Sequence, residues 1–165
     1  MNYVDPKVSR DLETALAGDD KLELRLWLRL LTCSNLIEQH VRNGLREDFA
    51  TTLPRFDILA QLDRSPDGLS MGELSSLLMV SNGNVTGLID RLANEGLVAR
   101  QSVPGDRRTI RVRLTEYGKA QFDQMTPAHE RWIDDMLGSL AREDQEQLYG
   151  LLGELKKSIR NGGGG

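Results

Sequence analysis

Four arginines stand within seven positions of the chain, inside the stretch PGDRRTIRVRLTEYGK at residues 104–119. They are Arg107, Arg108, Arg111 and Arg113. A guanidinium forms paired hydrogen bonds to phosphate oxygens, and it is drawn into narrow minor grooves, where negative potential is concentrated. The cluster therefore points to a polyanion such as nucleic acid, although a solvated strand face would show the same residues.

The charge of the whole chain makes this cluster more informative. Its 165 residues include 21 Lys+Arg and 25 Asp+Glu, for a net charge of −4. Residues 81–113 contain six arginines and three acidic residues, so this segment carries +3 and the other 132 residues carry −7. Such asymmetry indicates a polyanionic partner at one face of the protein.

The sequence offers little for catalysis. One cysteine and two widely spaced histidines supply neither a nucleophile with its base nor a metal-ligand set. We therefore predict that the protein is not an enzyme and has no cofactor. A lone Cys33, no signal peptide and no apolar run of about 20 residues together predict a cytoplasmic protein that does not enter the membrane.

Two short helices are expected just before the arginines. Ser70 and Glu73 have the spacing of a capping box, and Leu74, Leu77 and Leu78 form the expected buried face of the first helix. The second helix has an N-cap and a glycine terminator, and its apolar residues recur at i, i+3, i+4 and i+7. These positions are Ser81, Gly96 and the stripe Val85, Leu88, Ile89 and Leu92. The pair predicts a helix-turn-helix.

A β-hairpin is expected next, because alternating segments at 97–103 and 109–115 flank a Pro-Gly-Asp turn. Ile110, Val112 and Leu114 are its expected inner face. A helix-turn-helix with a basic hairpin behind it is a winged helix-turn-helix. Its second helix matches the major groove, about 12 Å wide, and the hairpin reaches the neighbouring minor groove or phosphates.

The predicted DNA contacts come from the polar side of the second helix and from the hairpin. They are Ser81, Asn82, Asn84, Thr86, Arg91, Arg107, Arg108 and Arg111. We expect Arg108 in the minor groove with Arg107 close by. Arg111 and Arg113 are expected to contact phosphates or support the hairpin.

Long amphipathic helices flank this region. Residues 21–48 have an apolar residue every three, four or seven positions, which predicts a helix about 40 Å long. Thr115 is expected to cap another helix, which runs towards Met136, with Pro127 expected to kink or interrupt it. The last helix begins near Ala141 and carries the stripe Leu148, Leu151, Leu152, Leu155 and Ile159. Such helices need an elongated neighbour, for example another subunit.

The predicted fold class is mainly α with a small β-hairpin, a winged helix-turn-helix plus long dimerisation helices. The expected regions are an N-terminal extension at 1–20, a dimerisation region at 21–53 and 116–160, a DNA-binding region at 54–115 and a flexible tail at 161–165.

Residues 21–160 resemble the MarR family of bacterial transcription regulators. The resemblance rests on LPRFDILAQL, VSNGNVTGLIDRLANEGLVAR and DRRTIRVRLTEYG in that order, including the Asp-x-Arg at Asp106 and Arg108. It implies a homodimer with intertwined first, fifth and sixth helices, which binds double-stranded DNA at a pseudo-palindromic operator. It also implies a repressor that a small molecule releases. Gly87 departs from many relatives, which have a basic or bulky residue there.

Within the family, the stretch TTLPRFDILAQLDRSPDGLSM is most similar to regulators of aromatic-acid catabolism, which implies an aromatic acid or its coenzyme A thioester as effector. The family places the effector between the long helices and the DNA-binding part. The candidate lining residues are Trp27, His40, Arg42, Arg46, His129 and Trp132. Arg25 and Arg29 join Arg42 and Arg46 as a possible arginine cluster for coenzyme A.

Each candidate also has a simpler interpretation, since tryptophans at helical spacing often form a dimer core and arginines often form a solvated face. Two other functions stay open. A redox-sensing repressor would use Cys33, although peroxide-sensing relatives carry their cysteine about five residues earlier on another helix face, and a small buried residue is the simpler interpretation. A pure dimerisation module would explain the helices but not the arginine hairpin.

Overall fold

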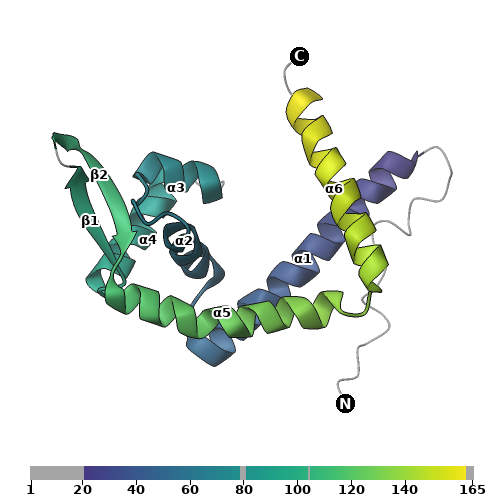
Figure 1. Ribbon diagram of the computed structural model, residues 1–165, viewed down its shortest axis with the longest axis horizontal. Coiled ribbons are helices and arrows are strands. Elements are labelled where there is room, and N and C mark those ends of the chain that lie inside the picture. Colours follow the sequence, from purple (N-terminus) through teal and green to yellow (C-terminus); the bar gives the residue numbers. More distant parts are fainter. Residues whose placement is uncertain (1–20, 79–80, 104, 163–165) are drawn as a thin grey trace.

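The computed structural model describes residues 21–78, 81–103 and 105–162, and within these ranges it leaves the side chains of residues 82, 103 and 106–109 undescribed. The elements are α1 (Leu22–Phe49), α2 (Leu53–Asp63), α3 (Met71–Leu78), α4 (Asn82–Asn94), β1 (Val98–Val103), β2 (Asp106–Leu114), α5 (Glu116–Leu137) and α6 (Arg142–Gly162). The predicted fold class, mainly α with one antiparallel hairpin, is confirmed. Helix α5 runs from the hairpin end of the molecule to α6 (Figure 1).

The two ends of the sequence need separate comment. The predicted N-terminal extension at 1–20 lies outside the described residues, as do residues 163–165. Asn161 and Gly162 belong to α6, so the flexible tail was predicted to begin too early. No helix within the described ranges has both the length and the apolar character needed to cross a membrane.

Helix α2 lies at the centre of the hydrophobic core. Its Phe56, Leu59 and Leu62 recur every three residues and are buried. Pro54 lies in the first turn, where a missing N–H costs no hydrogen bond. Helices α3, α4 and α5 pack around α2, so the core joins the helix-turn-helix to the long helices.

The helix-turn-helix forms as its caps predict. The backbone N–H of Glu73 donates to Ser70 Oγ at 3.2 Å, and the Ser70 N–H donates to the Glu73 carboxylate at 2.7 Å. Leu74 is fully buried, but Leu77 is 50% exposed, so its predicted burial is wrong. The elements that pack on this eight-residue helix cover its Leu74 side only.

Helix α4 carries its apolar stripe towards the core. Val85, Ile89 and Leu92 are fully buried, and Leu88 packs partly against them. The helix ends at Gly96, whose φ of 75° lies in the left-handed region that glycine adopts without strain. The chain can then turn directly into β1.

The hairpin is antiparallel and is joined to the helix-turn-helix by one more backbone bridge. Val98 pairs with Leu114 and Arg100 with Val112, with an irregularity between Ser102 and Val103. The buried Val112 also exchanges two backbone hydrogen bonds with Leu69, at 2.8 and 3.0 Å. Ile110 is 48% exposed, contrary to the prediction, because it lies beyond this bridge towards the hairpin tip.

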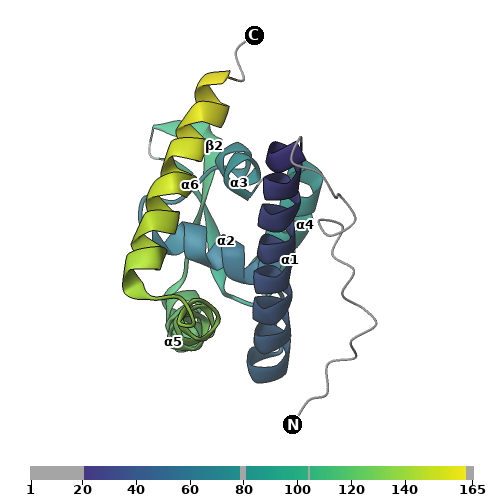
Figure 2. The same cartoon turned by 90° about the vertical axis from the view of Figure 1, so that its right-hand side faces the viewer.

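The long helices leave much of their apolar surface uncovered. Only Val41 and Leu45 of α1 are buried, and α6 has no buried residue. Figure 2 looks along α5 and shows α6 rising above it on the left, with α1 standing apart on the right. Helix α5 continues through Pro127, so the prediction that Pro127 interrupts the helix is wrong, and the alternative of a kink stays a prediction. Since Pro127 is exposed, water can replace the one backbone donor that proline lacks.

Candidate DNA-binding interface and neighbouring pockets

The polar side of α4 is exposed, as its predicted role requires. Asn84, Thr86 and Arg91 are all exposed, while the side chain of Asn82 lies outside the described part. Ser81 Oγ accepts a hydrogen bond from the Asn84 N–H at 3.4 Å and caps the helix. Because a hydroxyl can accept and donate at once, this capping role leaves the Ser81 O–H proton available to a phosphate.

The arginines of the hairpin fall into two groups. Arg107 and Arg108 belong to β2 near the tip, and their side chains lie outside the described part. Arg111 donates to the Gly68 carbonyl oxygen at 2.7 Å and lies 3.8 Å from the Glu73 carboxylate. Arg111 therefore supports the hairpin, one of its two predicted roles.

Both carboxylates at the C-terminal part of α4 and its cap are paired with arginines of other elements. Arg100 of β1 donates to Asp90 at 2.5 Å. Arg55 of α2 forms two parallel hydrogen bonds to Glu95, the shorter of which joins Nη2 to Oε2 and the other Nη1 to Oε1 at 2.7 Å. The hydrogen bonding lowers the pKa of Glu95 and raises that of Arg55. These pairs link α4 and its cap to α2 and β1, and they offset the negative charge of the two carboxylates.

Two pockets lie beside α4. The first, which we call the Asp57 pocket, has a volume of about 630 Å³. It is lined by Glu38, Arg42, Leu53, Pro54, Asp57, Leu78, Gly83, Asn84, Gly87, Leu88 and Arg91. Burial raises the pKa of Asp57, the charge of Glu38 raises it further, and Arg42 opposes both. Arg42 forms an ion pair with Glu38.

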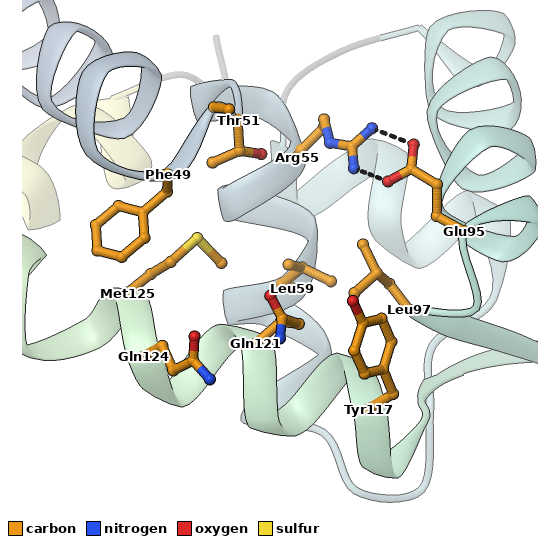
Figure 3. Close-up of a pocket in the computed structure, with 11 residues that line it drawn as sticks. Phe49, Thr51, Arg55, Leu59, Glu95, Leu97, Tyr117, Gln121, Gln124 and Met125 are labelled. Carbon is orange, nitrogen blue, oxygen red and sulfur yellow. Dashed lines mark hydrogen bonds and ion pairs between the residues drawn. The ribbon is translucent and has the colours of Figure 1, made fainter.

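The second, which we call the Arg55 pocket, has a volume of about 420 Å³ and is drawn in Figure 3. It is lined by Phe49, Ala50, Thr51, Arg55, Leu59, Glu95, Leu97, Tyr117, Gln121, Gln124 and Met125. It lies where α1, α2 and α5 meet the end of α4, and it contains the Arg55–Glu95 pair.

The six residues predicted to line an effector site do not gather at one pocket. Arg42 lines the Asp57 pocket, and the other five line neither pocket. Trp132 is buried against Phe49, with ring centroids 6.3 Å apart, and His129 stacks on Phe56 at 4.8 Å. Arg46 donates to the Asn43 side chain at 3.2 Å.

The remaining candidates are on the surface of α1 within the described chain. Trp27 is 56% exposed, His40 is exposed, and so is Cys33, contrary to the interpretation of Cys33 as a buried apolar residue. Arg55, Asp57 and Glu95 stand in no local sequence pattern that predicts a site. Arg55 and Glu95, for example, are 40 residues apart in the chain.

Comparison with known proteins identifies relatives among bacterial transcription regulators. Residues 51–109 match a model described as MarR family. The chain is 33% identical over 145 residues to the HTH-type transcriptional regulator PecS of Dickeya dadantii, with 87% of each chain covered. It is 31% identical over 140 residues to the transcriptional repressor YetL of Bacillus subtilis, covering 84% of this chain and 83% of YetL. It is 32% identical over 133 residues to the transcriptional activatory protein BadR of Rhodopseudomonas palustris, covering 78% and 75%.

Solved structures give the same result. A MarR family transcriptional regulator from Silicibacter pomeroyi is 33% identical, with a TM-score of 0.73 over 87% of this chain and 99% of that one. Sco3205 from Streptomyces coelicolor, solved in complex with DNA, has a TM-score of 0.74 at 22% identity, over 87% of this chain and 91% of that one. The second comparison speaks for the fold alone.

Proposed function

The chain belongs to the MarR family of DNA-binding transcriptional regulators, and from this premise we propose that it is a homodimeric repressor that leaves its operator when a small aromatic acid, or the coenzyme A thioester of one, binds. The observation that carries the proposal is the exposed polar side of α4, held by two arginine–carboxylate pairs beside an arginine-bearing hairpin.

Residues 54–115 are the proposed DNA-binding region. In this arrangement α4 enters the major groove, with contacts from Ser81, Asn82, Asn84, Thr86 and Arg91. The hairpin tip then brings Arg107 and Arg108 to the adjacent minor groove, while Arg111 keeps the hairpin against the turn at Gly68.

Residues 21–53 and 116–160 are the proposed dimerisation region. Its support is the apolar surface that the chain leaves exposed: Leu22, Leu26 and Trp27 on α1, and the α6 stripe from Leu148 to Ile159. A two-fold dimer would place its two α4 helices in successive major grooves, about 34–36 Å apart. The operator would then be a pseudo-palindrome.

The proposed effector site lies between these two regions. Both pockets are of a size suited to a small aromatic ligand, since ligand pockets commonly have volumes of about 300–1,000 Å³. Each also contains an arginine, which a carboxylate ligand needs as a partner in a partly buried site. Occupation of either pocket would bias the position of α4, because α4 or its C-terminal cap lines both.

The direction of regulation is part of the proposal, since among the relatives YetL is named a repressor and BadR an activatory protein. Selection of bound duplexes from a random pool tests the operator. Inverted repeats with centres about 10–10.5 base pairs apart are expected. Titration of the selected duplex with aromatic acids and their thioesters then tests release. Sites without two-fold symmetry would contradict the dimer, and binding that no such ligand weakens would contradict the effector.

The exposed Cys33 keeps a redox-sensing repressor as the second candidate. The same titration with peroxide in place of the acid separates the two candidates, and a Cys33→Ser variant is the control. Release by peroxide in the wild type only would favour the redox reading.

A further inference from the structure

The Arg55 pocket has a simple chemical composition. Among its described lining residues, Arg55 is the only cation and Glu95 the only anion. Phe49, Leu59 and Met125 supply an apolar wall, and Figure 3 shows Gln121 and Gln124 on α5 facing the Arg55–Glu95 pair across the pocket. An aromatic body with one polar end therefore suits this space better than a polyanion does.

The ion pair in this pocket can exchange one of its members. Glu95 lies on the outer side of the pair, with its side chain 48% exposed, whereas that of Arg55 is 21% exposed. A ligand carboxylate that took the place of Glu95 would leave the guanidinium paired, and Glu95 would move only from a half-exposed position into water. The exchange thus avoids the large cost of leaving a charge buried without a partner.

Arg55 also has a donor to spare. Its Nε is buried and has no hydrogen-bond partner among the described residues, while Nη1 and Nη2 are both used by Glu95. The present pair therefore leaves part of the guanidinium unsatisfied, and an unsatisfied buried donor carries a free-energy cost.

Glu95 connects this exchange to DNA binding. It is the C-cap residue of α4, directly before the turn at Gly96. Its ion pair with Arg55 is a polar contact that joins the end of α4 to α2. When Arg55 binds another carboxylate, this end of α4 loses its polar link to α2 and keeps its apolar contacts, the Asp90–Arg100 pair and the hydrogen bond from Thr115 to the Gly96 carbonyl.

We propose that the Arg55 pocket binds an aryl monocarboxylate as the free carboxylate and not as its thioester, and that this carboxylate replaces Glu95 on Arg55 and so releases the C-terminal end of α4. This inference rests on the proposed function, because it assumes that α4 reads DNA and that a ligand controls it. It also chooses between the two ligand forms. A coenzyme A thioester has no free carboxylate at the acyl group and adds several phosphate charges, which the single cation of this pocket does not balance.

The experiment measures ligand binding by calorimetry without DNA. The probes are benzoate, phenylacetate and 4-hydroxycinnamate, each paired with its primary amide, which keeps the shape and lacks the charge. The proteins are the wild type, Glu95→Gln, Arg55→Gln, Arg55→Lys and Arg42→Gln, the last as a control in the Asp57 pocket. Thermal melts establish that each variant is folded.

Glu95→Gln should bind at least one acid more tightly than the wild type, by at least about fivefold, because a neutral amide competes less well for Arg55. Arg55→Gln should lose this binding, Arg55→Lys should weaken it, and Arg42→Gln should leave it unchanged. The amides should not bind. Equal binding of acids by the wild type and Glu95→Gln, equal binding of acid and amide, loss of binding only in Arg42→Gln, or no binding of any acid would each overturn the proposal.

Release from the selected duplex separates this inference from the proposed function. If an acid releases the wild type and the Glu95 and Arg55 variants alike, the repressor proposal holds and the pocket assignment falls. If no acid or thioester releases the wild type, the effector part of the proposed function fails. The calorimetric result still decides whether the Arg55 pocket binds aryl carboxylates.

Discussion

At Gly118, near the start of α5, there is room for hydrogen but not for a methyl group. A Cβ built there would lie 1.9 Å from the Leu97 carbonyl oxygen, which is backbone and cannot rotate away. We expect Gly118→Ala to lower the free energy of unfolding by about 1–3 kcal/mol through overpacking. Gly72→Ala is the matched control, since nothing lies within 4 Å of its added Cβ, and it should be neutral or stabilising. Urea denaturation of both variants measures the difference, and equal stability would contradict the close approach.

His129 should make stability depend on pH just below neutrality. Burial lowers its pKa from the ordinary value of 6.5, with a further lowering by Arg64 and an opposing effect of Glu130. The folded protein therefore favours neutral His129, and the unfolded chain takes up the proton first. The stability that the protein gains by keeping His129 neutral is fully present above pH 6.5. It is lost as the pH falls through the lowered folded-state pKa of His129.

His129→Phe tests this dependence, because it keeps a ring against Phe56 and removes the titration. As the pH falls below about pH 7, the wild type should lose stability relative to the variant, as followed by thermal melts. Parallel pH profiles for the two proteins would show that His129 has no such role.

Replacing Arg108 and replacing Arg111 should affect different properties of the protein. Arg108→Ala should weaken operator binding and flatten its salt dependence, because each phosphate-type contact adds about 0.9 to the log–log slope and a dimer would lose two contacts. Arg111→Ala should instead lower the melting temperature, since its hydrogen bond to Gly68 is lost. Salt titrations and melts of both variants separate the two roles. An unchanged slope in Arg108→Ala would place that side chain away from the DNA.

At the scale of elements, the sequence predicts best where an interaction spans a few residues. The caps at Ser70, Ser81 and Thr115 and the terminator Gly96 are confirmed, because each depends on residues within four positions. The helix-turn-helix and the hairpin followed from them.

The sequence could not predict contacts between distant elements. Nothing local brings Arg55 to Glu95 or Arg100 to Asp90, and the pockets beside them depend on how whole helices pack. For the same reason the exposure of Leu77 escaped a prediction based on periodicity alone. The effector site was the least accurate of the sequence predictions, since only Arg42 of the six candidate residues lines either pocket.

Thr115 joins two elements and should be sensitive to substitution. Its hydroxyl accepts from the Gly118 N–H at 2.9 Å and donates to the Gly96 carbonyl oxygen at 2.6 Å, so it caps α5 and binds the turn after α4. Thr115→Ala should cost about 1–2 kcal/mol of stability, whereas Thr115→Ser, which keeps the hydroxyl, should cost much less. Chemical denaturation distinguishes them, and similar losses in both variants would assign the effect to the methyl group.

At the scale of the whole molecule, charge and apolar surface are separated. The segment 81–113 carries +3, and the rest of the chain carries −7. An acidic body beside a basic reading face repels the DNA backbone except where the arginines approach it, which limits binding in wrong orientations. Most of the uncovered apolar surface lies on α1 and α6, away from the hairpin in Figure 1.

Helix α6 gives the clearest test of the proposed dimer. Its stripe of four leucines and one isoleucine is exposed along its length, although most of the stability of a helix in a protein comes from packing of its apolar face. A second subunit would cover the stripe. Leu155→Glu would then place one carboxylate from each subunit in an apolar interface, and a total cost of about 3 kcal/mol would raise the dimer dissociation constant about 100-fold.

Lys157→Glu is the matched control, because it introduces the same side chain two positions away, on the side of α6 opposite the stripe. Sedimentation should show a wild-type dimer at micromolar concentration, a Lys157→Glu dimer, and a Leu155→Glu protein that dissociates on dilution. Operator affinity should fall with the dimer, since one subunit can occupy only one half-site. A wild-type monomer, or a Leu155→Glu protein that stays dimeric on dilution, would show that the α6 stripe is not the contact between subunits.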